Sequence, residues 1–471
     1  MSSYTSSRPR LSVEQALASF LVDEGLPFAE VMSVAAVEQA LRDEDVVFAE
    51  TKKSVYTPAV TLGAFLSQVL DKDKSCRAAV SRVLALLVAR GQKPCSLDTG
   101  AYCRARAKLP ASVLKRLTLQ TGRNLEDQID DDWLWHGRHV TLIDGTTLTM
   151  PDTVDNQKAY PQPSTQKPGC GFPMIRLVVL MSLATAALLD MALAPYAGKE
   201  TGETALLRGL FADLKPGDIL LADRYYCNYW LVAMARARGV DVVFRMHQLR
   251  AYDFRRGQRL GVDDHIVSWS RPQRPDWMDK ATYATMPLSL TVREVRGTVA
   301  APSCRIDELV IATTITDAET YTTEETLDLY HERWHVEPDI RAIKQSLSIE
   351  HLRCKSPFMI AKELWAHFLG YNLTRKAACQ AAALQEVSPR EVSFTAVQQT
   401  INAARSQLTA AAPAERVRQG LLLLKEVGKE RVGDRPDRWE PRLVKKRPKS
   451  YKHLREPRAN MHANKFKKEA G

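Results

Sequence analysis

Apolar positions along the chain follow two different periods, which separate helical regions from strand-rich ones. From about residue 12 to 125 they recur at helical spacing, as in SVEQALASFL and SCRAAVSRVLALLVAR. The pattern is interrupted at Gly91, Pro94 and Pro110, residue types that end helices. The sequence therefore predicts a helical N-terminal region.

The pattern changes at residue 139 to short apolar runs, which are typical of buried strands. Two helical segments, 203–214 and 229–239, separate the later runs. The predicted order is β-β-β-α-β-α-β, which indicates an α/β fold with a mixed sheet flanked by helices. The predicted strands are VTLI (140–143), IRLVVLMSL (175–183), TAALLDMAL (185–193), DILLA (218–222) and VDVVF (240–244).

Between about 249 and 321 the pattern is broken by a polar, Arg-rich stretch that contains Trp269 and Trp277. Two strand-like runs follow, LSLTVREV and ELVIATTIT, so we expect a β-rich insertion. Helical spacing resumes at Thr322, where T-T-E-E-T offers a capping box, and it continues to about residue 430.

The positive charge of the chain is concentrated at its C-terminal end. The formal net charge is +11, and residues 441–471 contain eleven Lys or Arg and two Glu, a net charge of +9. A basic tail favours a polyanionic partner, most commonly nucleic acid, although a merely solvated terminus has the same composition. Lys445, Lys446 and Arg447 are the candidate DNA contacts within it.

Length and cysteine usage set the broad class. A chain of 471 residues with 45% hydrophobic residues is expected to form two to four domains. The eight cysteines are scattered without a C-x-x-C pair, so no structural zinc site is expected. Because no apolar stretch suits a signal peptide or a membrane span, we expect a cytoplasmic protein.

A basic helix in the N-terminal region is a candidate for DNA recognition. The helix around Cys76–Arg90, the break GQKPCS and the helix TGAYCRARAKL have the order of a helix-turn-helix. In that arrangement Tyr102, Arg104, Arg106 and Lys108 would face DNA. Helical pairs with basic outer faces are common, so a purely structural role stays open.

Two aspartates are predicted where strands end. Asp144 follows VTLI and precedes Gly-Thr-Thr, and Asp223 follows DILLA and precedes Arg224. Ligands gather at strand ends in sheets of this kind, so carboxylates from two strands can share one metal site. A single strand-end aspartate more often only caps a turn, but the two together favour the metal site.

A third carboxylate stands in the segment YHERWHVEPDIRAIK, with an aromatic hydroxyl and two cations. On an α-helix, Tyr330, Arg333, Glu337 and Lys344 would fall within an arc of about 60° on one face. A carboxylate flanked by cations suits a site that holds a divalent metal and a phosphate together. A solvent-exposed face with ion pairs has the same residues, and for this segment alone it is the commoner case.

These residues resemble the signature of a known family. The spacing Tyr-x-x-Arg-x-x-x-Glu-x-x-x-x-x-x-Lys is that of the insertion-sequence-four family of bacterial DDE transposases, and the chain matches it at all four positions. The likeness extends over DGTTLTMPDT, NQKAYPQPSTQKPGCGFP, GDILLADRYY, HLRCKSPFMIAKELWAHFLGYNLTR and EPRLVKKRPKSY.

The resemblance implies an RNase H-like fold and a metal-dependent enzyme that cuts and joins DNA. It implies that Asp144, Asp223 and Glu337 are catalytic and bind two Mg²⁺ ions, for which Mn²⁺ can substitute. Pro338, which directly follows the glutamate, lacks an N–H and predicts a kink in the helix. The resemblance also implies that Tyr330, Arg333 and Lys344 contact the DNA phosphates of the element end. Arg224, which directly follows Asp223, is a further candidate DNA contact.

The same resemblance indicates the partners and the reaction. The protein would bind the inverted-repeat ends of an insertion sequence and a target duplex as a homodimer, at the bacterial nucleoid, and carry out cut-and-paste transposition. Two alternatives stay open: a metal-dependent nuclease without strand transfer, and an inactive DNA-binding protein. The intact carboxylate triad argues against the second.

Trp269 and Trp277 are candidates for a base-stacking role. In relatives of this family, an aromatic residue of the insertion has that role. That residue stacks on a base extruded when a hairpin forms at the element end. More often a Trp anchors the core of a small subdomain, and this alternative stays open.

The predicted domains are a helical DNA-binding region (1–135), the catalytic core in two parts (136–248 and 322–400), the β-rich insertion (249–321), and C-terminal helices with the basic tail (401–471).

Overall fold

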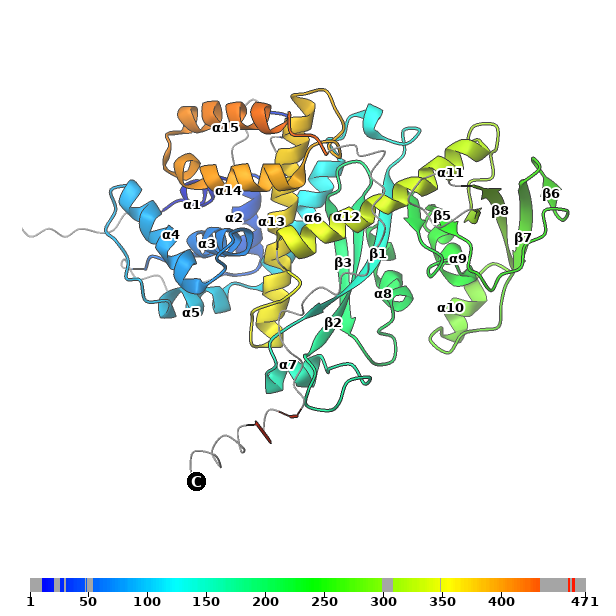
Figure 1. Ribbon diagram of the computed structural model, residues 1–471, viewed down its shortest axis with the longest axis horizontal. Helices are drawn as coiled ribbons and strands as arrows, with labels where there is room; N and C mark the ends of the chain where they lie inside the picture. The colour runs from blue at the N-terminus through cyan, green and yellow to red at the C-terminus, as the bar shows by residue number, and fades with distance from the viewer. Residues whose placement is uncertain are drawn as a thin grey trace, which may run out of the picture.

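A nine-stranded sheet runs through the part of the chain that the structure describes, which comprises residues 11–20, 26–28, 31–46, 48, 54–298, 308–347, 349–432, 456–457 and 460–461. In this computed structural model, helices from both ends of the chain form a block beside β3, and the sheet extends away from it (Figure 1). The strands are β1 (Val140–Thr149), β2 (Met174–Ser182), β3 (Leu188–Pro195), β4 (Ile219–Ala222), β5 (Asp241–Arg245), β6 (Gln258–Arg259), β7 (Asp264–Ser270), β8 (Ser289–Gly297) and β9 (Leu309–Thr313).

The first five strands form the core of the sheet in the order β3-β2-β1-β4-β5. β1, β4 and β5 are parallel, whereas β2 is antiparallel to both of its neighbours. This is the mixed, RNase H-like sheet flanked by helices that the sequence predicted, and that prediction is confirmed. All five predicted core strands are present.

β1 is ten residues long and continues beyond the predicted run VTLI. Asp144 therefore lies within a strand rather than at its end, and the sequence prediction is wrong on this point. β1 pairs with β4 only from Val140 to Leu142, but it pairs with β2 as far as Thr149. Asp144 thus stands two residues beyond the last pair with β4, where the two parallel strands part.

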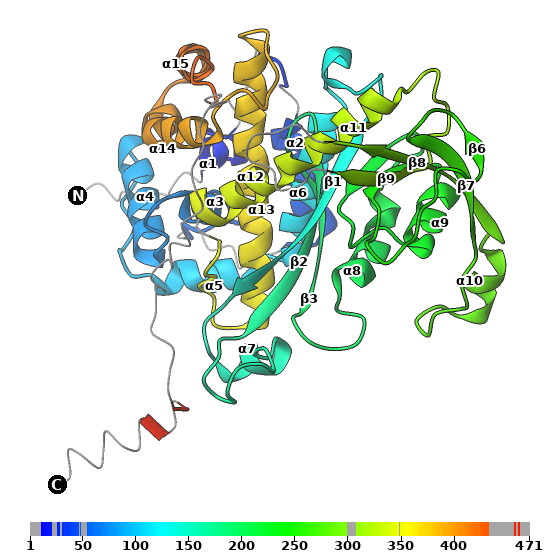
Figure 2. The same ribbon diagram turned by 45° about the vertical axis from the view of Figure 1, so that its right-hand side comes forward.

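The insertion continues the core sheet. β9 pairs antiparallel with β5, and β8, β7 and β6 follow outward (Figure 2). A buried ion pair fastens the insertion to the segment after it, because Arg293 Nε donates to Asp264 at 2.9 Å and Asp264 also accepts from the Thr323 hydroxyl at 2.7 Å. Arg293 donates to the carbonyl of Tyr321 at 2.7 Å as well. The start of α11 (Thr323–His331) is thereby fixed against the insertion.

One long helix, α13 (Pro357–Ala383), is the centre of the helical block (Figures 1 and 2). It is buried along most of its length, and its polar side chains bond to the backbone of its neighbours. The Asn372 amide accepts from the Leu188 N–H at 2.8 Å and donates to the carbonyls of Leu188 at 2.9 Å and Thr118 at 3.1 Å. α13 is thereby joined to β3 and to α6 (Ala111–Glu126).

The remaining helices surround α13 or cover the sheet. None of the helices among the described residues is both long enough and apolar enough to cross a bilayer. The other helices are α1 (Val13–Leu17), α2 (Val34–Asp43), α3 (Pro58–Leu70), α4 (Cys76–Ala89), α5 (Gly100–Lys108), α7 (Val154–Ala159), α8 (Glu203–Leu210), α9 (Tyr229–Ala237), α10 (Lys280–Thr285), α14 (Phe394–Ala410) and α15 (Pro413–Val427).

The segment that contains the four signature residues is not one uniform helix. α11 begins at the predicted Thr322 capping box and is followed by a 3-10 turn (Glu332–His335), by α12 (Val336–Arg341) and by a π-helical turn (Ala342–Ser346). Because Pro338 has no N–H, the carbonyl of the residue four positions earlier lacks its α-helical partner. The predicted irregularity is present, and the 60° arc, which assumed a uniform α-helix, does not describe this segment.

The contact of α6 with β3 leaves no room for a side chain at Gly122. A Cβ there would lie 2.4 Å from the carbonyl oxygen of Leu188, whereas a Cβ on Gly209 in α8 would meet nothing within 4 Å. We expect Gly122→Ala to destabilise the fold by about 1–3 kcal/mol. Gly209→Ala should instead stabilise it by about 0.5–1 kcal/mol, because alanine favours the helix. Urea unfolding of both variants checks this, and a shift of the same sign for both would contradict it.

Candidate active site

The parallel strands β1 and β4 bring Asp144 and Asp223 together. Asp223 directly follows the last residue of β4, as predicted. The Gly145 N–H donates to Asp144 Oδ1 at 2.7 Å, and the Tyr225 N–H donates to Asp223 Oδ1 at 2.8 Å. Both carboxylates are therefore oriented by the backbone, at the point where β1 and β4 part, and ligands commonly bind at such points of a sheet.

Burial raises the pKa of Asp144 to about 6. The negative charges of Asp223 and Glu203 raise this pKa further, whereas the Gly145 N–H and the Arg333 guanidinium lower it. Desolvation and like-charge repulsion both disfavour the ionised carboxyl group. The site thus holds a carboxylate whose ionised form would be stabilised by a bound cation.

Arg333 connects Glu337 to the aspartates. Its guanidinium lies 3.7 Å from the Glu337 carboxylate and also acts on the pKa of Asp144. Arg333 is 7% exposed, and its charge lowers the pKa of Tyr330, which burial raises to about 12. The Glu337 side chain is 46% exposed, so it lies at the open side of the site.

Lys344 reaches β1 from the π-helical turn. Its Nζ donates to the Thr146 hydroxyl at 2.7 Å, two residues beyond Asp144. The irregular helix geometry therefore brings Lys344 to the same region as the other three signature residues.

A buried carboxylate holds α12 in place. Asp339, which is 2% exposed, accepts from Arg375 Nη2 at 2.9 Å and from Arg390 Nη1 at 3.0 Å. Arg375 belongs to α13, and Arg390 also donates to the carbonyl of Ser182 at the end of β2, at 2.9 Å. The position of Glu337, two residues before Asp339, is set by these bonds.

Glu203, the first residue of α8, is a further carboxylate at the site that the sequence analysis did not identify. A Cβ added to Gly145 would lie 2.3–2.6 Å from the carboxyl atoms of Glu203, so the close approach requires glycine. The Tyr226 hydroxyl donates to Glu203 at 3.3 Å, and burial raises the pKa of Glu203. The glycine after Asp144 was the available signal, but no sequence pattern connects it to a helix almost sixty residues away.

A cluster of guanidinium groups faces the carboxylates. Arg245, at the end of β5, is another site residue that the sequence analysis did not identify. Burial lowers the pKa of Arg245, and the neighbouring charges of Arg224 and Arg333 lower this pKa further. Arg224 donates to the side chain of Gln248 at 3.1 Å. Three guanidinium groups beside Asp223 are suited to binding phosphate oxygens.

The donor set fits a hard divalent cation in chemical type, because carboxylate oxygens are the ligands that Mg²⁺ prefers. In the part of the chain that the structure describes, no three His, Cys, Asp or Glu side chains are close enough to hold a metal ion together. Glu337 is instead paired with Arg333.

The two tryptophans of the insertion lie in different environments. Trp269 on β7 is 3% exposed, its Nε1 donates to Glu294 at 2.9 Å, and Arg250 lies 3.7 Å from its ring centroid. It occupies a core position. Trp277 is half-buried in the loop between β7 and α10, with the guanidinium of Arg208 3.8 Å from its ring centroid.

The predicted helix pair of the N-terminal region, α4 and α5, is present, but its side chains divide into two groups. Tyr102 is fully buried and donates to Gln68 at 2.6 Å, so the expectation that it faces DNA is wrong. Arg106 is half-buried and also donates to Gln68, at 3.0 Å. Arg104 and Lys108 are exposed. The tail residues Lys445, Lys446 and Arg447 lie outside the described residues.

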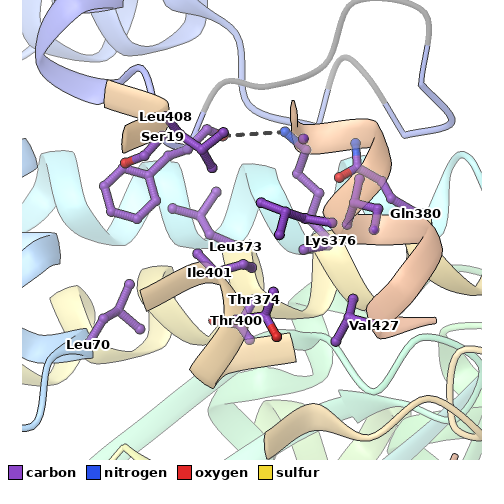
Figure 3. Close-up of a pocket in the computed structure, with 15 residues that line it drawn as sticks. Ser19, Leu70, Leu373, Thr374, Lys376, Gln380, Thr400, Ile401, Leu408 and Val427 are labelled. Atoms are coloured by element: carbon purple, nitrogen blue, oxygen red, sulfur yellow. Dashed lines mark hydrogen bonds between the residues drawn. The ribbon is translucent and has the colours of Figure 1, made fainter. Parts of the chain in front are cut away.

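A small apolar cavity lies away from these residues, among α1, α13, α14 and α15 (Figure 3). Its volume is about 60 Å³, and Leu373, Ile401 and Leu408 are among its lining side chains. Lys376 at its edge donates to the Phe20 carbonyl at 3.4 Å. The cavity contains none of the candidate catalytic residues and is too small and apolar for a nucleotide.

An RNase H-like sheet with acidic residues on its two central strands, ringed by guanidinium groups, defines an enzyme class that acts on phosphodiesters. The model of the transposase DDE domain family matches residues 135–373. The chain is 25% identical over 392 residues to the transposase InsG for insertion sequence element IS4 of Escherichia coli strain K12, which covers 82% of this chain and 84% of that protein. It is 30% identical over 148 residues to the putative transposase InsZ of the same organism, covering 31% and 48%.

A solved structure, the piggyBac transposase synaptic complex with hairpin DNA, aligns over 90% of this chain and 86% of that chain, with a TM-score of 0.41 and 12% identity. The chain belongs to the DDE transposase family, and the predicted resemblance to the insertion-sequence-four family is confirmed. The protein is a DNA transposase, an enzyme with a DDE catalytic domain.

The raised pKa of Asp144 predicts how stability depends on pH in metal-free protein. Since the folded-state pKa is about 6 and the unfolded value is 3.8, ionised Asp144 costs stability above pH 6, and this cost disappears as pH falls toward 4. Asp144→Asn should therefore be more stable than wild type at pH 7.5 in EDTA, on the order of 1–2 kcal/mol. The advantage should vanish near pH 4 in thermal unfolding.

Asp317→Asn provides the opposite control. Asp317 accepts backbone N–H bonds from Glu319 and Thr320, and its hydrogen bonds lower its pKa. Its replacement should destabilise the protein at pH 7.5. Equal behaviour of the two variants would contradict the assignment for Asp144.

Proposed function

We propose that this transposase cleaves DNA at the inverted-repeat ends of an insertion sequence and joins those ends to a target, using Asp144, Asp223 and Glu337 to bind two Mg²⁺ ions. The observation that supports this most directly is the buried Asp144 carboxyl group, raised in pKa by its burial and by Asp223 and Glu203. Divalent cations at this position would relieve that repulsion. Mn²⁺ has the same charge and oxygen preference, and we expect it to substitute.

Asp144, Asp223 and Glu337 would hold the metal ions, which would supply activation of the attacking oxygen and charge stabilisation of the leaving oxygen in an in-line displacement at phosphorus. The chain's own residues position the substrate. Arg224, Arg245 and Arg333 neutralise the oxygens of the scissile phosphate, and Lys344 supplies a further cation beside β1. Glu337 would exchange its ion pair with Arg333 for a metal, which frees that guanidinium for the phosphate.

Cleavage and joining are the same displacement with different nucleophiles, water in the first and the 3′-hydroxyl in the second. One set of residues therefore serves both steps, and no covalent enzyme intermediate is required. We further propose that the enzyme works in the cytoplasm at the nucleoid, as a homodimer that pairs two ends, with the basic tail 441–471 adding phosphate contacts.

Loss of any carboxylate should separate chemistry from binding. Each of three variants should reduce Mg²⁺-dependent nicking and strand transfer by at least about a thousandfold: Asp144→Asn, Asp223→Asn and Glu337→Gln. Each loses several kcal/mol of charge stabilisation in the transition state, and about 1.4 kcal/mol corresponds to a tenfold change in rate. Affinity for end DNA should stay within about threefold or increase, since phosphate contacts come from Arg and Lys.

The measurement is a gel assay of binding, nicking and joining on the same end-containing duplex. Glu430→Gln, which changes an exposed carboxylate three residues after α15, is the matched control and should behave as wild type. If a folded variant at Asp144, Asp223 or Glu337 still nicks DNA, the substituted residue is not a catalytic carboxylate. Nicking without joining by the wild-type protein would favour a nuclease.

The two tryptophans of the insertion should respond differently to substitution. We propose that Trp277 stacks on an extruded base, so Trp277→Ala should reduce hairpin formation at least about fivefold, in keeping with about 1–3 kcal/mol per stacked base, while nicking persists. Trp277→Phe should retain much of the activity. Trp269→Ala should instead lower fold stability by about 3–5 kcal/mol, because it empties a core position. Unchanged hairpin yield in Trp277→Ala would exclude the proposed role.

A further inference from the structure

A second basic site lies outside the catalytic region, in a cavity of about 580 Å³. Its walls come from α3, from the start of α4, from α5, and from the segment that leads into α13. Four cations line the cavity, together with one carboxylate, that of Glu363. The cations are Lys74, Arg106, Arg353 and Lys355.

The single carboxylate is already used by the backbone. Glu363 accepts the N–H groups of Arg353, at 2.9 and 3.0 Å, and of Cys354, at 2.9 Å. These bonds shape the loop before α13. The positive charges around the cavity therefore exceed the negative charge, and the only acid among the lining residues is held away from a ligand by its own bonds.

Two side-chain nitrogens at the cavity are buried without protein partners. His367, which is 1% exposed, has no hydrogen-bond partner for Nδ1 among the described residues, and the same holds for Arg106 Nε. Burial lowers the pKa of Lys74 to about 8, with Arg353 lowering it further and Glu363 opposing this. Lys74 Nζ and Arg106 Nη1 already donate to the Val69 carbonyl and to Gln68. Crowded, desolvated cations and an unpaired guanidinium N–H are the features of an anion site.

The N-terminus of α13 also faces the cavity. Ser356, its N-cap residue, lines the cavity and makes no side-chain capping bond, and the helix is 27 residues long. The positive end of a helix dipole favours a phosphate. Pro357 has no N–H, and the Met359 and Ile360 N–H groups already donate to the Ser356 carbonyl. The contribution of α13 is therefore that of its dipole.

β1 connects this cavity to the catalytic carboxylates. From Asp144 the strand runs to Thr149, which bridges to His351, and the loop to Arg353 follows directly. At about 3.3 Å per residue, the five residues from Asp144 to Thr149 span roughly 17 Å. For a duplex whose axis runs along β1, with a phosphate about every 3.4 Å per strand along that axis, this span corresponds to about five to seven nucleotides from the site of cleavage.

We propose that this cavity is a phosphate-binding site that holds a backbone phosphate of the element-end DNA, five to seven nucleotides from the scissile phosphate. The inference rests on the proposed function for its ligand. A DNA backbone phosphate and free inorganic phosphate carry the same chemical group. The experiments below therefore distinguish DNA from inorganic phosphate as the ligand of the cavity.

The first experiment measures the affinity for end-containing duplex as a function of salt concentration. Arg353→Gln and Lys355→Gln change exposed side chains and leave the backbone bonds to Glu363 in place. Each should weaken binding several-fold and reduce the slope of log affinity against log salt by about 0.9, the value for one lost phosphate contact. Arg238→Gln, an exposed arginine at the end of α9, should change neither.

The second experiment locates the phosphate. Neutral methylphosphonates are placed one at a time along each strand of the end duplex, and binding is measured with wild type and Arg353→Gln. One or two positions, five to seven nucleotides from the cut, should weaken wild-type binding but have no further effect on the variant. Independent, additive losses at every position would overturn the proposal.

Inorganic phosphate tests the source of the ligand. If it raises the thermal stability of the DNA-free wild type but not of Arg353→Gln, while the salt slopes of the two proteins are equal, the cavity binds free phosphate and the DNA contact is overturned. Failure of the wild type to bind end DNA at all would instead refute the proposed function. The phosphate titration would then still report on the cavity.

Discussion

The buried carboxylate of Asp339, held between Arg375 and Arg390, is the interaction on which the catalytic geometry depends. α12 has only six residues and stands between a 3-10 turn and a π-helical turn, so it has little stability of its own. Removing one partner of a buried ion pair typically costs about 3–5 kcal/mol. The third carboxylate is therefore placed by α13 and the end of β2, rather than by the helix that contains it.

α13 is buried along most of its length, and its polar side chains connect it to the elements around it. Asn372 joins it to β3 and α6, Arg375 joins it to α12, and Glu363 holds the loop that precedes it. Each of these polar groups is satisfied by backbone or by an opposite charge, as burial requires. The helical block and the catalytic sheet thus share one element, and a change in its packing would be felt at both.

The sequence predicted the core strands, the capping box at Thr322 and the approach of Arg333 and Lys344 to Asp144, because each depends on local periodicity or on fixed spacing. It failed where tertiary contacts decide. β1 continues through Thr146 and Thr149 because β2 pairs with it along its whole length. Tyr102 is buried, and its hydroxyl donates a hydrogen bond to Gln68 of α3. Glu203 approaches Gly145 although the two residues are far apart in sequence, and no local pattern connects them.

The pairing of β9 with β5 has a mechanical consequence. An insertion attached by two loops could swing toward its substrate, but this one is a continuation of the core sheet and is further fastened by Arg293 to Asp264. The position of the insertion's strands relative to the carboxylates is consequently set by hydrogen bonds between neighbouring strands, which resist bending. If the insertion contacts the element end as proposed, a fixed insertion leaves the conformational adjustment to the DNA, and its energetic cost varies with the flexibility of the terminal base steps.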